Sequence, residues 1–323
     1  MKASSNLEKV LSSGGFAVTG ELGPPKSVDS DLVRKKARLL KGFVDAVNIT
    51  DNQTAIVRVC SMAASRILLD EGIEPVMQMT CRDRNRLALQ SDILGAAALG
   101  VKNILCLSGD HMTLGNQPDA KGVYDIDSIQ LVRMAAGMRD EGKLLCGEEL
   151  RNTRKSELLP PRIFIGAAAN PFAPPLEFRV LRLAKKIAAG ADFIQTQTIF
   201  DLNKFKQWFS RIVDVGLHEK VAILGGVMPV KSHKALVYMK KNVAGMAIPD
   251  ELIQRMEQAP DPREEGVKLC AEIVQQLRDI EGLRGVHISS VEWEKVIPQV
   301  VELAGLLPRP AIAQGPSAES PSP

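Results

Sequence analysis

The sequence predicts an α/β protein that folds as a (β/α)8 TIM barrel, with extra helices before its last strand. Short apolar runs alternate with longer segments of helical periodicity along almost the whole chain, a rhythm typical of parallel βαβ units with right-handed crossovers. The length of 323 residues suits one such barrel. An open doubly wound sheet is the competing architecture. Its dinucleotide-binding form carries a G-x-G-x-x-G motif after the first strand, and this chain has none there.

The predicted strands are short and mostly apolar. The first contains the β-branched residues Val18 and Thr19 and gives out near Glu21. It ends there because Gly23 weakens a strand and the two prolines after it lack a backbone N–H. The other predicted strands span residues 44–49, 75–80, 103–107, 162–167, 192–197, 221–225 and 285–289.

The predicted helices fill the intervals between these strands. The first spans residues 29–40, with Asp29 or Ser30 as its N-cap. Later helices are expected at 55–71, 127–141, 175–189, 202–215, 232–240 and 290–303, the last despite Pro298. A further helix is expected to follow the strand at 75–80 and to end at residue 99. Residues 249–258 and 264–280 are predicted to form the extra helices before the last strand.

One barrel domain is expected over residues 1–306. Residues 307–323 are mostly Pro, Ser and Ala, and such a segment has too little to bury, so we predict a disordered tail. The first eleven residues lack the apolar core of a signal peptide. The longest apolar runs fall short of the ~20 residues that a membrane span needs. We therefore expect a cytoplasmic protein without a membrane span.

Charge and cysteine usage exclude further classes of protein. A net charge of +3 without a basic block gives no electrostatic basis for binding nucleic acid. The five cysteines form no C-x-x-C pair. This argues against a disulfide scaffold and against a zinc or iron–sulfur site made by this chain alone. No metal site is predicted.

Polar residues at the strand ends are the candidate functional groups, because barrel enzymes place their chemistry on the loops after the strands. Structural alternatives exist for single members: Glu21 as a solvated loop residue, Asp110 as the cap of a turn, and Asp83 as an N-cap or the partner of a neighbouring arginine. As a set they predict an active site at this rim, although the pattern does not name the reaction. The set comprises Glu21, Thr50, Asp51, Asn52, Thr80, Cys81, Arg82, Asp83, Ser108, Gly109, Asp110, Asn170, Gln195, Gln197 and Pro229.

Six segments together resemble the methylenetetrahydrofolate reductase family, in its flavin-dependent, single-barrel bacterial form. No single segment is diagnostic, but they occur in the family's order across roughly residues 15 to 305. The segments are GELGPP at 20–25, NITDN at 48–52, MTCRDRN at 79–85, LSGD at 107–110, GAD at 190–192 with TQTIFD at 196–201, and GVMPV at 226–230.

The resemblance implies reduction of 5,10-methylenetetrahydrofolate to 5-methyltetrahydrofolate by a reduced flavin. It assigns Glu21 as the general acid, which protonates a folate nitrogen so that the five-membered ring opens to a 5-iminium, the hydride acceptor. A dry barrel mouth would favour the protonated carboxyl group that this role needs. Asp110 matches the aspartate that meets the pterin and biases the flavin's potential, and Gln197 matches the glutamine that binds the pterin.

The same resemblance implies a flavin site and favours FAD over FMN. Thr50 and Gly109 match positions that line the flavin, and Gln197 lies beside it. Lys186 matches a lysine at the flavin phosphate, with a solvated helix lysine as the structural alternative. In this reading the flavin carries the redox chemistry and the protein orients it.

Departures from the family pattern concern the electron donor. NADH-using relatives place an aromatic ring where this chain has His233. They often carry arginine at Ser108 and histidine at Gln78. The flavin reaction is therefore better supported than direct use of NADH. The donor is expected to be NAD(P)H or a cysteine-rich partner subunit with iron–sulfur or zinc sites, in an oligomer or a heteromeric complex.

Two other functions share these features. A pterin-binding barrel methyltransferase would pass a methyl group to a corrinoid protein without a flavin. A non-catalytic scaffold subunit of a redox complex would keep the barrel and not need Glu21. Both stay open at the level of sequence.

Overall fold

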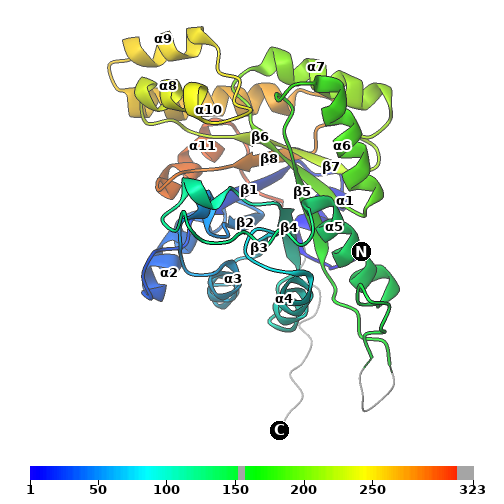
Figure 1. Cartoon of the computed structure of the whole chain (residues 1–323). Helices are drawn as coiled ribbons and strands as arrows, with labels where there is room; N and C mark the ends of the chain where they lie inside the picture. Colours follow the sequence, from blue (N-terminus) through cyan, green and yellow to red (C-terminus); the bar gives the residue numbers. More distant parts are fainter. Residues whose placement is uncertain (152–156, 311–323) are drawn as a thin grey trace.

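Eight parallel strands close into a barrel in the computed structural model, which describes residues 1–151 and 157–310. Each strand pairs with its sequence neighbours, and β1 also pairs with β8 to complete the ring (Figure 1). The predicted TIM barrel is confirmed. The strands are β1 (Ala17–Leu22), β2 (Ala46–Ile49), β3 (Pro75–Thr80), β4 (Asn103–Leu107), β5 (Phe164–Ala169), β6 (Phe193–Thr198), β7 (Ala222–Val227) and β8 (Gly285–Ile288).

Helices surround the barrel and include the predicted extra pair before β8. Within the described residues, no helix has both the length and the apolar composition that a bilayer span requires. After the N-terminal helix α1 (Asn6–Ser12), the helices are α2 (Ser30–Leu40), α3 (Ser61–Asp70), α4 (Arg86–Ala98), α5 (Ser128–Ala136), α6 (Leu176–Ala188), α7 (Leu202–Asp214), α8 (His233–Asn242), α9 (Asp250–Gln258), α10 (Pro262–Arg278) and α11 (Ile297–Leu303).

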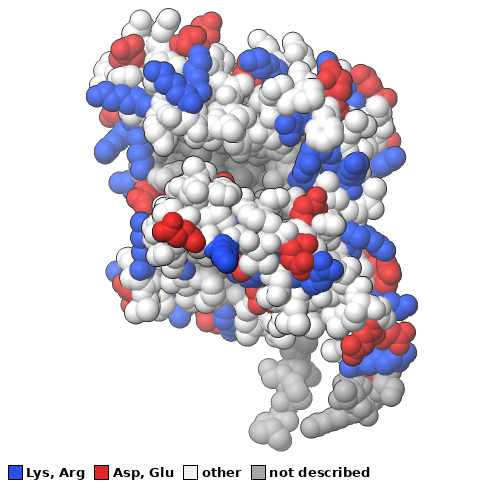
Figure 2. All heavy atoms as spheres, in the orientation of Figure 1, with Lys and Arg blue, Asp and Glu red and all other residues white. Residues whose placement is uncertain are grey.

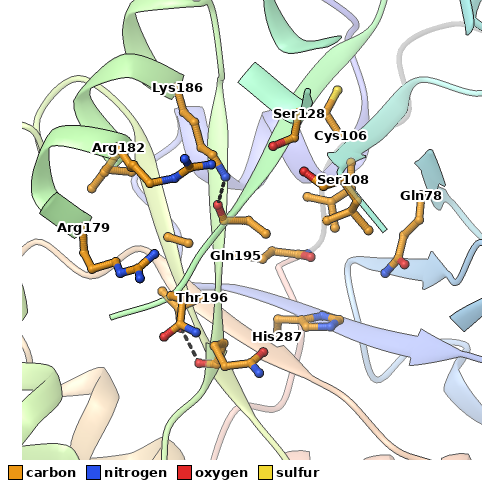
Figure 3. Close-up of a pocket in the computed structure, with 17 residues that line it drawn as sticks. Gln78, Cys106, Ser108, Ser128, Arg179, Arg182, Lys186, Gln195, Thr196 and His287 are labelled. Atoms are coloured by element: carbon orange, nitrogen blue, oxygen red, sulfur yellow. Dashed lines mark hydrogen bonds between the residues drawn. The ribbon is translucent and has the colours of Figure 1, made fainter. Parts of the chain in front are cut away.

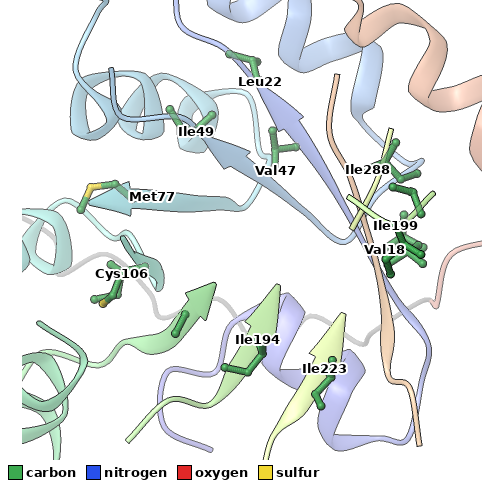
Figure 4. Packing of buried hydrophobic residues seen from close by; sticks show 14 of the residues in the cluster. Val18, Leu22, Val47, Ile49, Met77, Cys106, Ile194, Ile199, Ile223 and Ile288 are labelled. Carbon is green, nitrogen blue, oxygen red and sulfur yellow. The ribbon is translucent and has the colours of Figure 1, made fainter. Parts of the chain in front are cut away.

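Strand side chains that face outward pack under these helices. Val18, Val47, Met77, Ile194 and Ile288 are at most 1% exposed and belong to one large apolar cluster (Figure 4). Because side chains alternate along a strand, their neighbours Thr19, Asn48, Gln78, Gln195 and His287 face the barrel interior. The sequence therefore builds an apolar layer outside the strands and a polar one within.

The floor of the barrel is apolar and is sealed by α1, which the sequence analysis did not predict. Leu7 and Val10 of α1 are fully buried in a cluster with inward-facing side chains from the lower ends of the strands. Among these, the rings of Phe164 and Phe193 stack with centroids 5.3 Å apart. A helix of seven residues is too short to be stable by itself. It is stabilised by its contacts with the barrel that it covers, and the local sequence does not contain these contacts.

Two predicted helices begin later than expected. Residues 55–60 are not part of α3, because Thr54 and Ala55 have φ values of 57° and 53°, which a right-handed helix does not allow. Residues 53–55 form a short 3₁₀ turn instead. The prediction for 290–303 is wrong in its first part as well: α11 begins at Ile297, so Pro298 occupies its first turn, where a missing N–H is harmless.

The predicted tail boundary at residue 307 is also too early. The Arg309 guanidinium lies 2.5 Å from Asp45 and donates a hydrogen bond to the backbone oxygen of Phe16. Its side chain is 10% exposed, so this residue belongs to the base of the barrel. The rest of the predicted tail, 311–323, lies outside the described residues.

Candidate active site

A buried network of polar side chains lies inside the barrel, above the apolar floor. Gln195 Nε2 on β6 donates to Thr19 Oγ1 on β1 at 3.3 Å. Thr19 Oγ1 lies 3.0 Å from His287 Nδ1 on β8, and Asn48 Nδ2 on β2 lies 3.4 Å from the same nitrogen. Each of these side chains is at most 7% exposed. The barrel therefore holds its polar groups in fixed positions from four different strands.

Glu21 stands next to this network. It is 6% exposed, and its Oε2 lies 3.6 Å from His287 Nε2. The strand register pairs Glu21 with Asn48 and Thr19 with His287. Glu21 is thus a member of β1 rather than a loop residue, and the solvated-loop alternative is wrong.

A cavity of about 400 Å³ opens beside this network (Figure 3). One end is lined by amide and imidazole side chains, those of Gln78, Gln195, Gln197 and His287. Glu21 and Asp110 do not line the cavity. Figure 2 shows that this face of the molecule is hollowed and that much of the hollow's border is uncharged.

The other end of the cavity is cationic. Arg179, Arg182 and Lys186 of α6 line it, and the described lining contains no Asp or Glu. Arg179 donates to the backbone oxygens of Ala173 and Pro174, and Arg182 lies over the ring of Phe178 at 5.9 Å. In the part of the chain that the structure describes, none of the three cations forms an ion pair with a carboxylate.

Lys186 is the most deeply placed of these cations. It is 8% exposed, and its Nζ donates to the backbone oxygen of Ala168. Burial, together with the nearby positive charge of Arg182, lowers the pKa of Lys186 to about 8. A buried ammonium beside an uncompensated guanidinium is a site prepared for an anion. The alternative of a solvated helix lysine is wrong.

Gln197 lies where the pairing of β6 with β7 is irregular. The register shifts between Gln195 and Thr198, and such irregularities re-aim side chains near functional sites. The Thr196 hydroxyl accepts from Gly226 N at 2.8 Å and donates to the backbone oxygen of Gln197. Gln195 and Gln197 both line the cavity, but Thr196 between them lines it as well.

Asp110 is exposed on the loop after β4. Its Oδ2 accepts a hydrogen bond from Thr54 N at 2.9 Å, so it also caps the turn after β2. Gly109 before it has φ 89°, and a Cβ there would lie 3.0 Å from Arg82 Cβ and 3.1 Å from Thr80 Cβ. Only glycine fits this approach without strain.

Several strand-end residues serve the scaffold instead. Asp51 is buried and accepts from Thr80 N, from the Thr80 hydroxyl and from Arg84. Asp83 pairs with Arg82 at 2.7 Å, as its structural alternative predicted. The contacts of Asp51 fix the loops after β2 and β3 relative to one another.

Two buried side-chain oxygens at the end of β2 lack a hydrogen-bond partner in the described part of the chain. Thr50 Oγ1 and Asn48 Oδ1 have no hydrogen-bond partner among the described residues. A buried oxygen without a partner costs about 1–3 kcal/mol. Neither Thr50 nor Asn48 is among the described residues that line the cavity. Within the same residues, no group of three or more His, Cys, Asp and Glu side chains is arranged to hold a metal ion.

Comparison with known proteins matches the chain to one family. The family model for methylenetetrahydrofolate reductase covers residues 6–147 and 161–305. The chain belongs to this family. A 5,10-methylenetetrahydrofolate reductase of Pectobacterium carotovorum subsp. carotovorum is 22% identical over 241 residues, covering 73% of this chain and 72% of that protein.

Other relatives are longer. Methylenetetrahydrofolate reductase 1 of Schizosaccharomyces pombe is 25% identical over 251 residues, covering 75% of this chain. This chain spans only 37% of that protein. Among solved structures, a Clostridium thermocellum protein described as binding two copies of 5-methyl-5,6,7,8-tetrahydrofolic acid has a TM-score of 0.65 and 18% identity, covering 94% of this chain and 99% of its own. That likeness supports the fold.

Three residues of this family member escaped the sequence analysis. Arg179 and Arg182 precede Lys186 by seven and four positions, which places all three near one face of a helix. From that spacing the sequence analysis could have predicted that the two arginines lie beside Lys186. His287 gave none, because a single histidine in a short apolar strand looks like a core residue. Only the closed barrel brings it to Glu21.

Proposed function

We propose that the protein catalyses the flavin-dependent reduction of 5,10-methylenetetrahydrofolate to 5-methyltetrahydrofolate in one-carbon metabolism. The observation that carries this proposal is the buried Glu21 carboxyl group, set beside a cavity with amides at one end and unpaired cations at the other. Family membership supplies the reaction. The methyltetrahydrofolate named for the Clostridium thermocellum protein is consistent with a pterin ligand in this fold.

The cationic end fits the phosphate of a flavin. Lys186 and Arg182, with Arg179 beside them, would hold this phosphate by charge-assisted hydrogen bonds. Thr50, Gly109 and Gln197 would line the ring system, and the free Thr50 oxygen suits a polar ring edge. The bound flavin would supply the hydride. FAD is the form that the sequence resemblance favours. FMN is the alternative, because both forms present a phosphate.

Glu21 would act as the general acid. Its carboxyl O–H bond would break as a folate nitrogen gains the proton and the five-membered ring opens. Gln197 would orient the pterin from within the barrel. Asp110 would meet the pterin from the loop that Gly109 holds, although it lies outside the cavity lining. The closed, apolar floor keeps the site dry from below.

The electron donor and the assembly remain part of the proposal. We propose NAD(P)H or a cysteine-rich partner subunit as donor, within an oligomer or heteromeric complex in the cytoplasm. Nucleic acid is not a proposed partner. His233, expected in place of a stacking aromatic ring, begins α8 directly after its N-cap Ser232.

The visible spectrum of the purified protein tests the function. We expect absorption at about 370 and 450 nm from bound flavin, bleached by anaerobic addition of 5-methyltetrahydrofolate in the reverse half-reaction. Flavin absorption that does not change when the folate is added would refute the proposed substrate. A protein that stays colourless after incubation with FAD and FMN would refute the flavin, and transfer of a methyl group to a corrinoid protein would then establish the methyltransferase.

A further inference from the structure

The neighbours of the His287 ring determine which of its nitrogens carries a proton. Asn48 Nδ2 bears only hydrogens, so His287 Nδ1 must accept from it. Thr19 Oγ1 already accepts from Gln195, which leaves its own proton free to point at the same Nδ1. Two donors on Nδ1 place the proton of the neutral ring on Nε2.

The Nε2–H of this tautomer faces Glu21. Nε2 lies 3.6 Å from Glu21 Oε2, slightly longer than a hydrogen bond. Catalytic hydrogen bonds are often long in the free protein and shorten when charge develops. Thr19, Asn48 and Gln195 carry no charge, so Glu21 is the only ionisable group that contacts His287 among the described residues.

We propose that His287 is a positioning residue for Glu21. Its Nε2–H is directed at Glu21 Oε2, which leaves Oε1 to carry the acidic proton toward the substrate. When that proton moves to the folate nitrogen, one O–H bond breaks and one N–H bond forms, and a carboxylate remains in a buried site. The fixed Nε2–H stabilises this carboxylate as it forms, in the way that a preorganised donor stabilises developing charge.

This inference rests on the proposed function for its chemistry but not for its geometry. It gives a reason for a buried histidine in the polar layer of the barrel.

Nitrogen NMR of the protein labelled with ¹⁵N-histidine tests the geometry directly. The chain has four histidines, so comparison with H287Q assigns the His287 signals. We expect an unprotonated Nδ1 and a protonated Nε2 at neutral pH. In T19V, which loses one donor to Nδ1, the signals should shift toward a mixture of tautomers. A proton on Nδ1 in the wild-type protein would overturn the proposal.

Kinetics of the folate half-reaction test the role. We expect H287L to slow this step roughly 10²- to 10³-fold, the effect of removing one preorganised donor, while flavin affinity stays unchanged. H287Q, which keeps an N–H donor, should recover most of the rate. H218L is the matched control, because His218 lies at the opposite end of the barrel near Phe164 and Arg284.

The double variant E21Q/H287L separates positioning from general damage. If His287 acts through Glu21, the second substitution adds nothing to the loss caused by E21Q alone. If the rate losses of the two single variants multiply in the double variant, the positioning role is refuted. A loss of flavin affinity equal to the loss of rate would refute it as well. If the wild-type protein shows no folate reaction, the proposed function fails while the NMR result still decides the tautomer.

Discussion

Replacing Lys186 with methionine should stabilise the cofactor-free protein while weakening its flavin. Burial lowers the pKa of this amine from its ordinary 10.5 to about 8. At about 1.4 kcal/mol for each pH unit, holding the ammonium in the fold costs about 3 kcal/mol. Below pH 8 the amine is protonated in both the folded and the unfolded protein, so the full cost is present. Between pH 8 and 10.5 the folded protein releases the proton while the unfolded chain still binds it, and the cost disappears.

The assay is urea unfolding of the cofactor-free wild type and K186M at pH 7 and pH 10. We expect K186M to be more stable by up to about 3 kcal/mol at pH 7, with a smaller difference at pH 10. FMN and FAD should bind K186M roughly 10- to 100-fold more weakly, the value of a charged hydrogen bond, whereas riboflavin, which lacks the phosphate, should bind equally well. K185M is the control, since Lys185 is exposed on the same helix. Equal stability at both pH values, or an equal loss for riboflavin, would refute this reasoning.

Three further substitutions test the other parts of the site. E21Q should keep the bound flavin and slow the folate half-reaction by about 10²- to 10⁴-fold in stopped-flow traces; an unchanged rate would support the scaffold alternative. D51A should lower the free energy of unfolding by about 1–3 kcal/mol, because it leaves the buried Thr80 N–H without its acceptor, whereas Arg84 keeps its second partner Asp92; a neutral result in urea would contradict the scaffold role. G109A should cost about 1–3 kcal/mol from its left-handed backbone and weaken flavin binding, and a wild-type thermal midpoint would show that the loop adapts.

The barrel was predictable because each strand carries its own signal. Apolar runs bounded by Gly, Pro and polar residues located every strand to within a few residues, and the apolar outward face of each strand requires a helix over it. The late start of α3 involves a long-range contact. Thr54, which has positive φ, donates its N–H to Asp110, 56 residues away, and local propensity does not contain such a contact.

The site was predictable only as a set of strand ends. Their order along the chain and the alternation of side chains placed Gln195 and Gln197 on one face. The sequence did not separate Glu21 from Asp51, since both are carboxylates near the end of a strand. The difference arises from their partners: Asp51 accepts from Arg84 and Thr80, whereas Glu21 faces the His287 imidazole.

The sealed floor closes this barrel at its base. Leu7, Val10 and the stacked pair Phe164 and Phe193 close its lower end, so every reactant that reaches the interior passes the rim formed by the loops after the strands. For the proposed reaction, a folate and a second reactant would have to use this rim in turn. A protein that delivers electrons would have to dock where the substrate enters and leave before the substrate binds.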